Sequence, residues 1–270
     1  MSIHFNNSAK LRDGTGNPIN SLDGALDIHG ADPHHIVYNQ FLHYDTATTT
    51  TLAVATAVGA ISIELTSAVG FAVADQLKIE NGSQEPNFPR IRTLVGNVAT
   101  LDRPLTFAHA IGTDVTKVYT NIAQAGLTTT ASVASPVIFT SHVPVGTVVH
   151  VTGMSIVMTD TSAMDFTTFG GVAALANGCV PSAYSEGVFG VYTNWKTNLD
   201  ISSDSFPISY QTKVGGGEYG LAAIYNIKDA TDAIVYLNGT LGDRFQLIVQ
   251  DDLTGLTAFR IKLQGHYEGI

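Results

Sequence analysis

The sequence predicts a mostly-β protein with an extended N-terminal arm, a small β-module and a C-terminal β-sandwich of the jelly-roll type. In many short segments, apolar and polar residues alternate with a period of two, as they do in half-buried strands. Turn signals built from Gly, Asn and Asp separate these segments, and helical periodicity is scarce. These patterns divide the chain into residues 1–46, 47–120 and 121–270.

The first segment, residues 1–46, is predicted to be an arm. Turn signals at 13–18 and 23–24 leave only short apolar pieces, at 25–28 and 36–38. These pieces are too few to build a core alone, so we expect them to add strands to a neighbouring subunit. The candidate interface residues are apolar and histidine side chains of this arm: Leu11, Leu26, Ile28, His34, His35, Ile36, Tyr38 and Phe41.

The second segment, residues 47–120, is predicted to be a compact β-module. Asn81-Gly82 and Gly96-Asn97 are hairpin or turn signals, and the threonines at 48–51 read as a linker that enters the module. The strands expected in the module lie at 60–65, 76–80, 90–94, 98–101 and 114–119.

The third segment, residues 121–270, contains many short strands with regular turns, which favour a sandwich or jelly roll. Asn238-Gly239 is a hairpin signal, and Asp251-Asp252 are expected at a hairpin tip. Residues 160–182 read as a long surface loop, whereas 183–195 are compatible with either a short helix or a strand. The other expected strands lie at 145–159, 233–237, 244–250 and 259–264.

The charge content favours assembly with other protein chains. Charged residues make up 13% of the chain, about half the usual share of roughly 25%. Charge is depleted at the cores of subunit interfaces, so this composition favours an oligomer over a thinly charged monomer. The net charge is -10, and the densest basic spot is the pair Arg90 and Arg92. Direct nucleic-acid binding and adhesion to anionic membranes are therefore not expected.

The opening residues and the single cysteine bear on location. Residues 1–7 lack a basic region followed by an apolar one, and no apolar stretch approaches the roughly 18 residues of a membrane span. We therefore expect a chain that is made and assembled in a cytoplasm. The lone Cys179 cannot form an internal disulfide and is expected to be a small buried hydrophobe.

The residues able to carry chemistry form no recognisable motif. His29, His34, His35 and His43 lack the spacing of metal ligands, and neighbouring residues of a strand point to opposite faces. The Asp251-Asp252 pair is better explained by turn formation than by a glycosidase pair. Glycines 215–217 lack the lysine and helix of a phosphate-binding loop. No catalytic, cofactor-binding or metal-binding residue is predicted.

The aromatic residues leave one binding hypothesis open. Trp195, together with Tyr184, Tyr192 and Tyr210, could line a sugar-binding groove. The same residue types also mark protein interfaces and pack in cores.

Two stretches carry a resemblance to a known class. Residues 11–21 with 24–29 resemble N-terminal segments of tailed-bacteriophage structural proteins. Residues 69–79 with 96–97, 101–105, His109 and Gly112 are similar to small β-modules of phage tail and virion accessory proteins. The resemblance implies a non-enzymatic, multi-copy virion protein, in a capsid-decorating, neck or tail accessory position. Its partners would be itself and other virion proteins, and no cofactor or catalytic residue is carried over.

Two other classes remain as alternatives. One is a glycan- or receptor-binding module of a phage tail or fibre, which would use Trp195 and the nearby tyrosines. The other is a polysaccharide-degrading enzyme, although the sequence lacks both long β-helical repeats and a readable acid/base pair.

Overall fold

Strands dominate the structure, and the prediction of a mostly-β protein is confirmed. No helix in the described part of the chain is long and apolar enough to cross a membrane. The computed structural model describes residues 21–22, 25–26, 37–80, 85, 88–122, 132–185, 188–191, 194–201, 208–214, 218–226 and 235–268.

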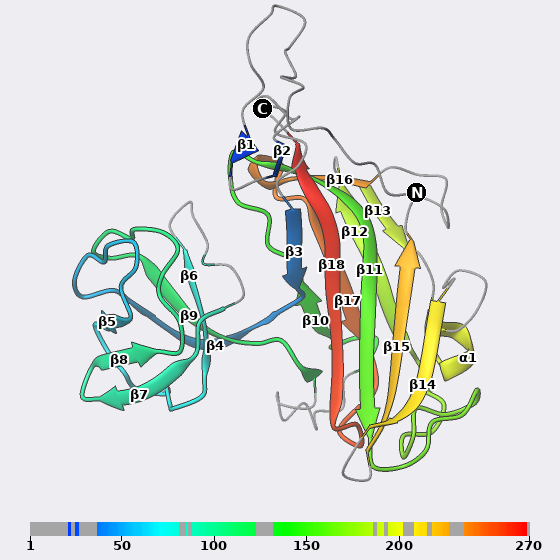
Figure 1. Cartoon of the computed structure of the whole chain (residues 1–270). Coiled ribbons are helices and arrows are strands. Elements are labelled where there is room, and N and C mark those ends of the chain that lie inside the picture. The colour runs from blue at the N-terminus through cyan, green and yellow to red at the C-terminus, as the bar shows by residue number, and fades with distance from the viewer. Residues whose placement is uncertain are drawn as a thin grey trace, which may run out of the picture.

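The larger body is a sandwich of two antiparallel sheets (Figure 1). The first sheet has the strand order β14 (Ile208–Val214), β15 (Glu218–Asn226), β11 (Val148–Asp160), β18 (Ala258–Glu268) and β3 (Val37–Phe41), and β16 (Val235–Asn238) also pairs with β11. The second sheet has the order β10 (Val137–Thr140), β17 (Arg244–Val249), β12 (Cys179–Ser185) and β13 (Val188–Val191).

The core of the sandwich lies between the two sheets. On β11, Met154, Ile156 and Met158 are buried, whereas the intervening Val157 is exposed. This is the period-two alternation of a strand that has one face on a core. From the opposite sheet, Phe245 on β17 packs into the same cluster. The predicted sandwich is therefore confirmed, but a jelly-roll arrangement is not confirmed by this strand order.

The smaller body is a β-module with its own core. It consists of two three-stranded sheets: β4 (Tyr44–Thr51), β9 (Asp114–Tyr119) and β6 (Gln76–Glu80), then β5 (Ser62–Glu64), β8 (Val98–Leu101) and β7 (Ile91–Val95). The expected turn Gly96-Asn97 joins β7 to β8, where Val95 lies opposite Val98. The buried apolar residues of this module are Leu52, Ile63, Leu65, Phe71, Leu77, Ile79, Ile91, Ala99, Leu101, Leu105 and Val115.

Two predicted segment boundaries differ from the structure. Strand β3 pairs with β18, with Gln40 opposite Leu263, so residues 37–41 belong to the sandwich and not to a free arm. The Thr-rich stretch 48–51 is not a linker, because it lies in β4 and pairs with β9. Threonine is β-branched and therefore favours strands, which explains why this stretch pairs in a sheet and does not act as a linker. Of the arm, residues 21–22 and 25–26 form the paired strands β1 (Ser21–Leu22) and β2 (Ala25–Leu26).

Two predicted hairpins are wrong because the chain passes between sheets at both places. β16 lies in the first sheet and β17 in the second, and a 3-10 helix, η4 (Gly239–Leu241), connects them. Asn238 does not sit in a hairpin turn; its side chain accepts a hydrogen bond from the Thr240 amide. β17 and β18 also lie in different sheets, so Asp251 and Asp252 are not at a hairpin tip. The turn-forming role of Asp252 is confirmed, since it accepts from the Thr254 amide at 2.9 Å.

The region 160–195 is mixed. The loop predicted at 160–182 is shorter, because β11 extends to Asp160 and β12 begins at Cys179. It is also not wholly a surface loop, since it contributes Met164, Phe169 and Leu175 to the sandwich core. The following segment forms strands β12 and β13, and the helix α1 (Asn198–Ile201) comes after it.

Candidate functional site

The candidate interface residues of the arm fall into three groups. Leu26 lies in β2, where its backbone pairs with that of Ser21. Tyr38 and Phe41 lie in β3, on the edge of the six-stranded sheet. The remaining candidates lie outside the described residues: Leu11, Ile28, His34, His35 and Ile36.

Tyr38 is a core residue of its own chain. It is 2% exposed, and its hydroxyl donates to the His142 carbonyl oxygen at 2.9 Å. Burial raises the pKa of this phenol far above its usual range, with the charge of Tyr267 adding to the effect. The prediction of an interface role for the Tyr38 side chain is therefore wrong. Phe41 is half-buried, and the Lys262 ammonium lies 5.5 Å from its ring centre.

The small module carries many exposed apolar side chains. Val54 and Val58 lie on one side of the Thr56–His109 bridge, and Phe107 and Ile111 lie on the other. Val95 and Val98 face each other across the β7–β8 hairpin. Scattered apolar residues are normal on a surface, whereas grouped ones mark sites of interaction. The exposed large apolar residues of the module are Val54, Val58, Ile61, Val69, Val73, Val95, Val98, Phe107 and Ile111.

A buried Glu85–His109 pair fixes the loop beneath part of this surface. The Glu85 carboxylate is 2% exposed and accepts hydrogen bonds from the Thr106 and Phe107 amides at 2.7 and 2.8 Å. His109 Nε2 lies 2.9 Å from Glu85 Oε1. Burial alone would raise the pKa of Glu85, but the hydrogen bonds from His109 and the two amides lower it below its ordinary value. A single carboxylate therefore holds the loop that contains Thr106 and Phe107 in place.

A polar cleft of about 380 Å³ lies between the module and the sandwich. Arg90 and Arg103 reach it from the module and Arg260 from β18. Asp102 holds Arg103 at 3.1 Å, and the buried Arg260 Nε has no hydrogen-bond partner among the described residues. A buried cationic donor without a partner suits an anionic group. The cleft lining is completed by Phe41, Gln76 and Thr120.

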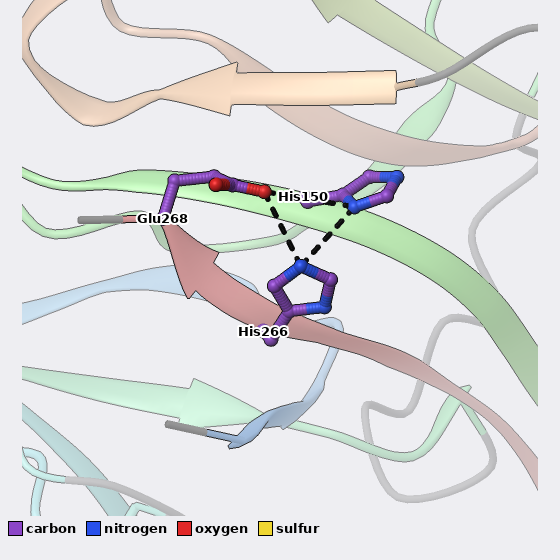
Figure 2. Close-up of side chains that lie close together, drawn as sticks. All are labelled: His150, His266 and Glu268. Atoms are coloured by element: carbon purple, nitrogen blue, oxygen red, sulfur yellow. Dashed lines mark hydrogen bonds and ion pairs between the residues drawn. The ribbon is translucent and has the colours of Figure 1, made fainter. Parts of the chain in front are cut away.

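A second polar cluster lies on the outer face of the six-stranded sheet (Figure 2). His150 on β11 stands opposite His266 on β18, and Glu268 follows two residues later on the same face. His150 Nδ1 lies 3.2 Å from His266 Nε2 and 3.7 Å from Glu268 Oε1. His266 Nε2 lies 3.2 Å from Glu268 Oε1. On the other side, the ring of Tyr236 on β16 stacks on His150 with centroids 4.9 Å apart.

Sequence reasoning missed this cluster. His150 and His266 are 116 positions apart, and only the pairing of β11 with β18 joins them. The alternation of His266 and Glu268 was the available signal, but the predicted last strand ended at residue 264, before both of them. The histidines singled out from the sequence lie elsewhere: His43 contacts Asp45 at 3.2 Å, and residues 29, 34 and 35 lie outside the described part.

The aromatic and cysteine candidates take structural roles. Trp195 is fully buried in the sandwich core, and its backbone pairs with that of Cys179, so it cannot form an exposed sugar-binding platform. Tyr184 is half-buried, with the Arg244 guanidinium 4.8 Å from its ring centre. The prediction for Cys179 is confirmed, because it is buried in the core. The side chains of Tyr192 and Tyr210 lie outside the described part.

Comparison with known proteins gives no relative. No protein-family model matches the chain, and no curated protein or solved structure is significantly similar to it.

Proposed function

We propose that the protein is a non-enzymatic, multi-copy structural subunit of a bacteriophage virion, in a capsid-decorating, neck or tail accessory position. The observation that carries the proposal is the set of grouped, exposed apolar side chains on the small module. The low charge content of 13% and the resemblance of the chain to virion proteins support it. Its partners are other copies of the chain and other virion proteins.

The arrangement of the two bodies suits this role. The module stands to one side of the sandwich, to which β3–β4 and the segment after β9 connect it (Figure 1). Its separate core keeps it folded while its outer surface remains open to a partner. Burial of apolar area contributes about 25 cal/mol per Å². The grouped valines, Ile111 and Phe107 would supply that area on association.

Charged substitutions on this surface test the proposal. Val95 is 76% exposed and Ile111 is 68% exposed, so Val95→Lys and Ile111→Lys should fold normally. Thr254→Lys, at an exposed polar position between β17 and β18 on the sandwich, is the matched control because it lies outside the module. Mass measured by light scattering should exceed the 28.5 kDa monomer for wild type and control and fall toward it for the two variants. A wild-type chain that is monomeric at every concentration tested would overturn the self-assembly part of the proposal.

The arm is tested separately by deletion of residues 1–36, which leaves β3 in place to close the sheet edge. The truncated protein should retain its buried Trp195 fluorescence but lose assembly. Normal assembly after this deletion would show that residues 1–36 do not hold the subunits together.

The alternative is a glycan- or receptor-binding module. The observation that favours it is the arginine-lined cleft, which suits an acidic sugar or another carboxylate. Titration calorimetry with sialic acid and glucuronic acid tests this alternative. Binding that is lost in Arg260→Met would support this alternative. The absence of a binding heat with either sugar would rule it out.

A further inference from the structure

We propose that His150, His266 and Glu268 form a zinc-binding site that links β11 to β18. This proposal is independent of whether the chain assembles. It rests on the positions of three ligand atoms, one from each residue, that lie within 4.8 Å of one another (Figure 2).

The backbone pairing brings the three residues together. His150 and His266 are directly opposite in the antiparallel ladder, and Glu268 lies two residues beyond His266. Residues two apart in a strand point to the same face, so all three side chains share the outer face of the sheet. Stacking with Tyr236 holds the His150 ring from the other side. The site is therefore built on three adjacent strands and not on a loop.

The distances match a tetrahedral ion. Neighbouring ligand atoms around a tetrahedral zinc with bonds of about 2.05 Å lie about 3.3 Å apart. The three separations here are 3.2, 3.2 and 3.7 Å. A single point about 2.0 Å from all three atoms satisfies these separations, which is the length of a zinc–nitrogen or zinc–oxygen bond. Octahedral neighbours at the same bond length would lie closer together, at about 2.9 Å.

The donor types select the kind of metal. Two imidazole nitrogens and one carboxylate oxygen suit zinc, and the same donor set also holds iron(II) and other first-row transition metals. Calcium and magnesium prefer a shell made of oxygen atoms only, so they fit this set poorly. The three side chains are 16%, 28% and 19% exposed, so water can reach the fourth position.

Zinc binding to the purified full-length chain without an affinity tag tests the proposal. After removal of metal with a chelator, titration calorimetry should show one zinc ion per chain at this site. His266→Gln and Glu268→Gln each remove one ligand and should weaken zinc binding by more than about 100-fold, the upper loss seen for residues that only support a ligand. Zinc should raise the melting temperature of the wild type but not that of Glu268→Gln.

Two controls separate this site from other histidines. His142→Gln removes a partly buried histidine that lies 3.3 Å from a carboxylate, that of Glu80, and it should leave zinc binding unchanged. The double variant His34→Gln, His35→Gln tests the histidine-rich arm and should also retain the ion. Circular dichroism without metal should be the same for all variants, and excess calcium should not displace zinc.

Three results would overturn the proposal. The first is the absence of saturable zinc binding by the wild type, which would leave only a hydrogen-bonded trio. The second is zinc binding that survives both His266→Gln and Glu268→Gln. The third is binding that is lost only in the arm variant, which would place the ion elsewhere.

Discussion

Replacing Glu85 with Gln should destabilise the small module while leaving the sandwich intact. The carboxylate uses both oxygens, because Thr106 donates to Oε2 and Phe107 to Oε1. A glutamine offers only one oxygen, so in either orientation at least one of the two partly buried amides faces an NH₂ group. Losing a hydrogen bond to a charged group and leaving a partly buried donor unpaired costs about 2 kcal/mol. With a urea dependence of about 1–2 kcal/mol per M, the midpoint of module unfolding should fall by about 1–2 M.

The assay uses the separate cores of the two bodies. Trp195, the single tryptophan, is buried in the sandwich and reports on that body alone. Far-ultraviolet circular dichroism reports on the strands of both bodies. Glu85→Gln should shift the part of the dichroism transition that comes from the module and leave the Trp195 transition in place. Glu64→Gln, at an exposed position of β5, is the control and should change stability by less than about 0.5 kcal/mol.

The pH dependence of the same variant follows from the lowered pKa of Glu85. A carboxyl group whose pKa is lower in the folded state stabilises the fold above its ordinary pKa, and this contribution is lost as the pH falls through the folded value. Wild-type module stability should therefore decline below the ordinary value of 4.5. Glu85→Gln should lack this part of the decline. Equal shifts of the dichroism and Trp195 transitions, or no shift of either, would refute the reasoning.

Three further outcomes are expected. Burial alone would raise the pKa of Asp45, but hydrogen bonds and charge from His43 and Lys78 lower it to about 2. An NMR titration should therefore find the Asp45 carboxyl ionised throughout mild acid, and a pKa near the ordinary value for aspartate would contradict these contacts. Burial raises the pKa of the Cys179 thiol, so iodoacetamide should label it only in denaturant, and rapid labelling of the native chain would be inconsistent with its burial. Gly265→Ala should lower the unfolding free energy of the sandwich by about 2 kcal/mol or more, because a Cβ at this position collides with the His150 carbonyl oxygen. Unfolding would be followed by Trp195 fluorescence, and an unchanged transition would contradict that packing.

Local pattern was sufficient to predict several strands of the fold. Gln76–Glu80 and Asp114–Tyr119 were predicted with the bounds that the structure has. In the first segment apolar residues occupy every second position, and in the second the β-branched Val115, Thr116 and Val118 favour a strand, so the information is local. The mostly-β class and the small module followed from the same signal.

Features that depend on pairing between distant segments could not be predicted. Asn238-Gly239 has the composition of a hairpin turn, yet Asn238 caps a 3-10 helix where the chain changes sheet. Tyr38 was predicted to contact a neighbouring subunit, because nothing in its local sequence shows that β3 pairs with β18 at the edge of the sheet. The cluster of His150, His266 and Glu268 exists only through the register of β11 and β18.

The central claim, that the chain is a multi-copy virion subunit, is tested most directly by its presence in purified particles. Phage particles from a culture that produces the chain would be separated by density gradient and examined by quantitative mass spectrometry. The proposal predicts that peptides of this chain band with the particles in several copies per particle. Peptides found only in the soluble fraction, with none in intact particles, would contradict it.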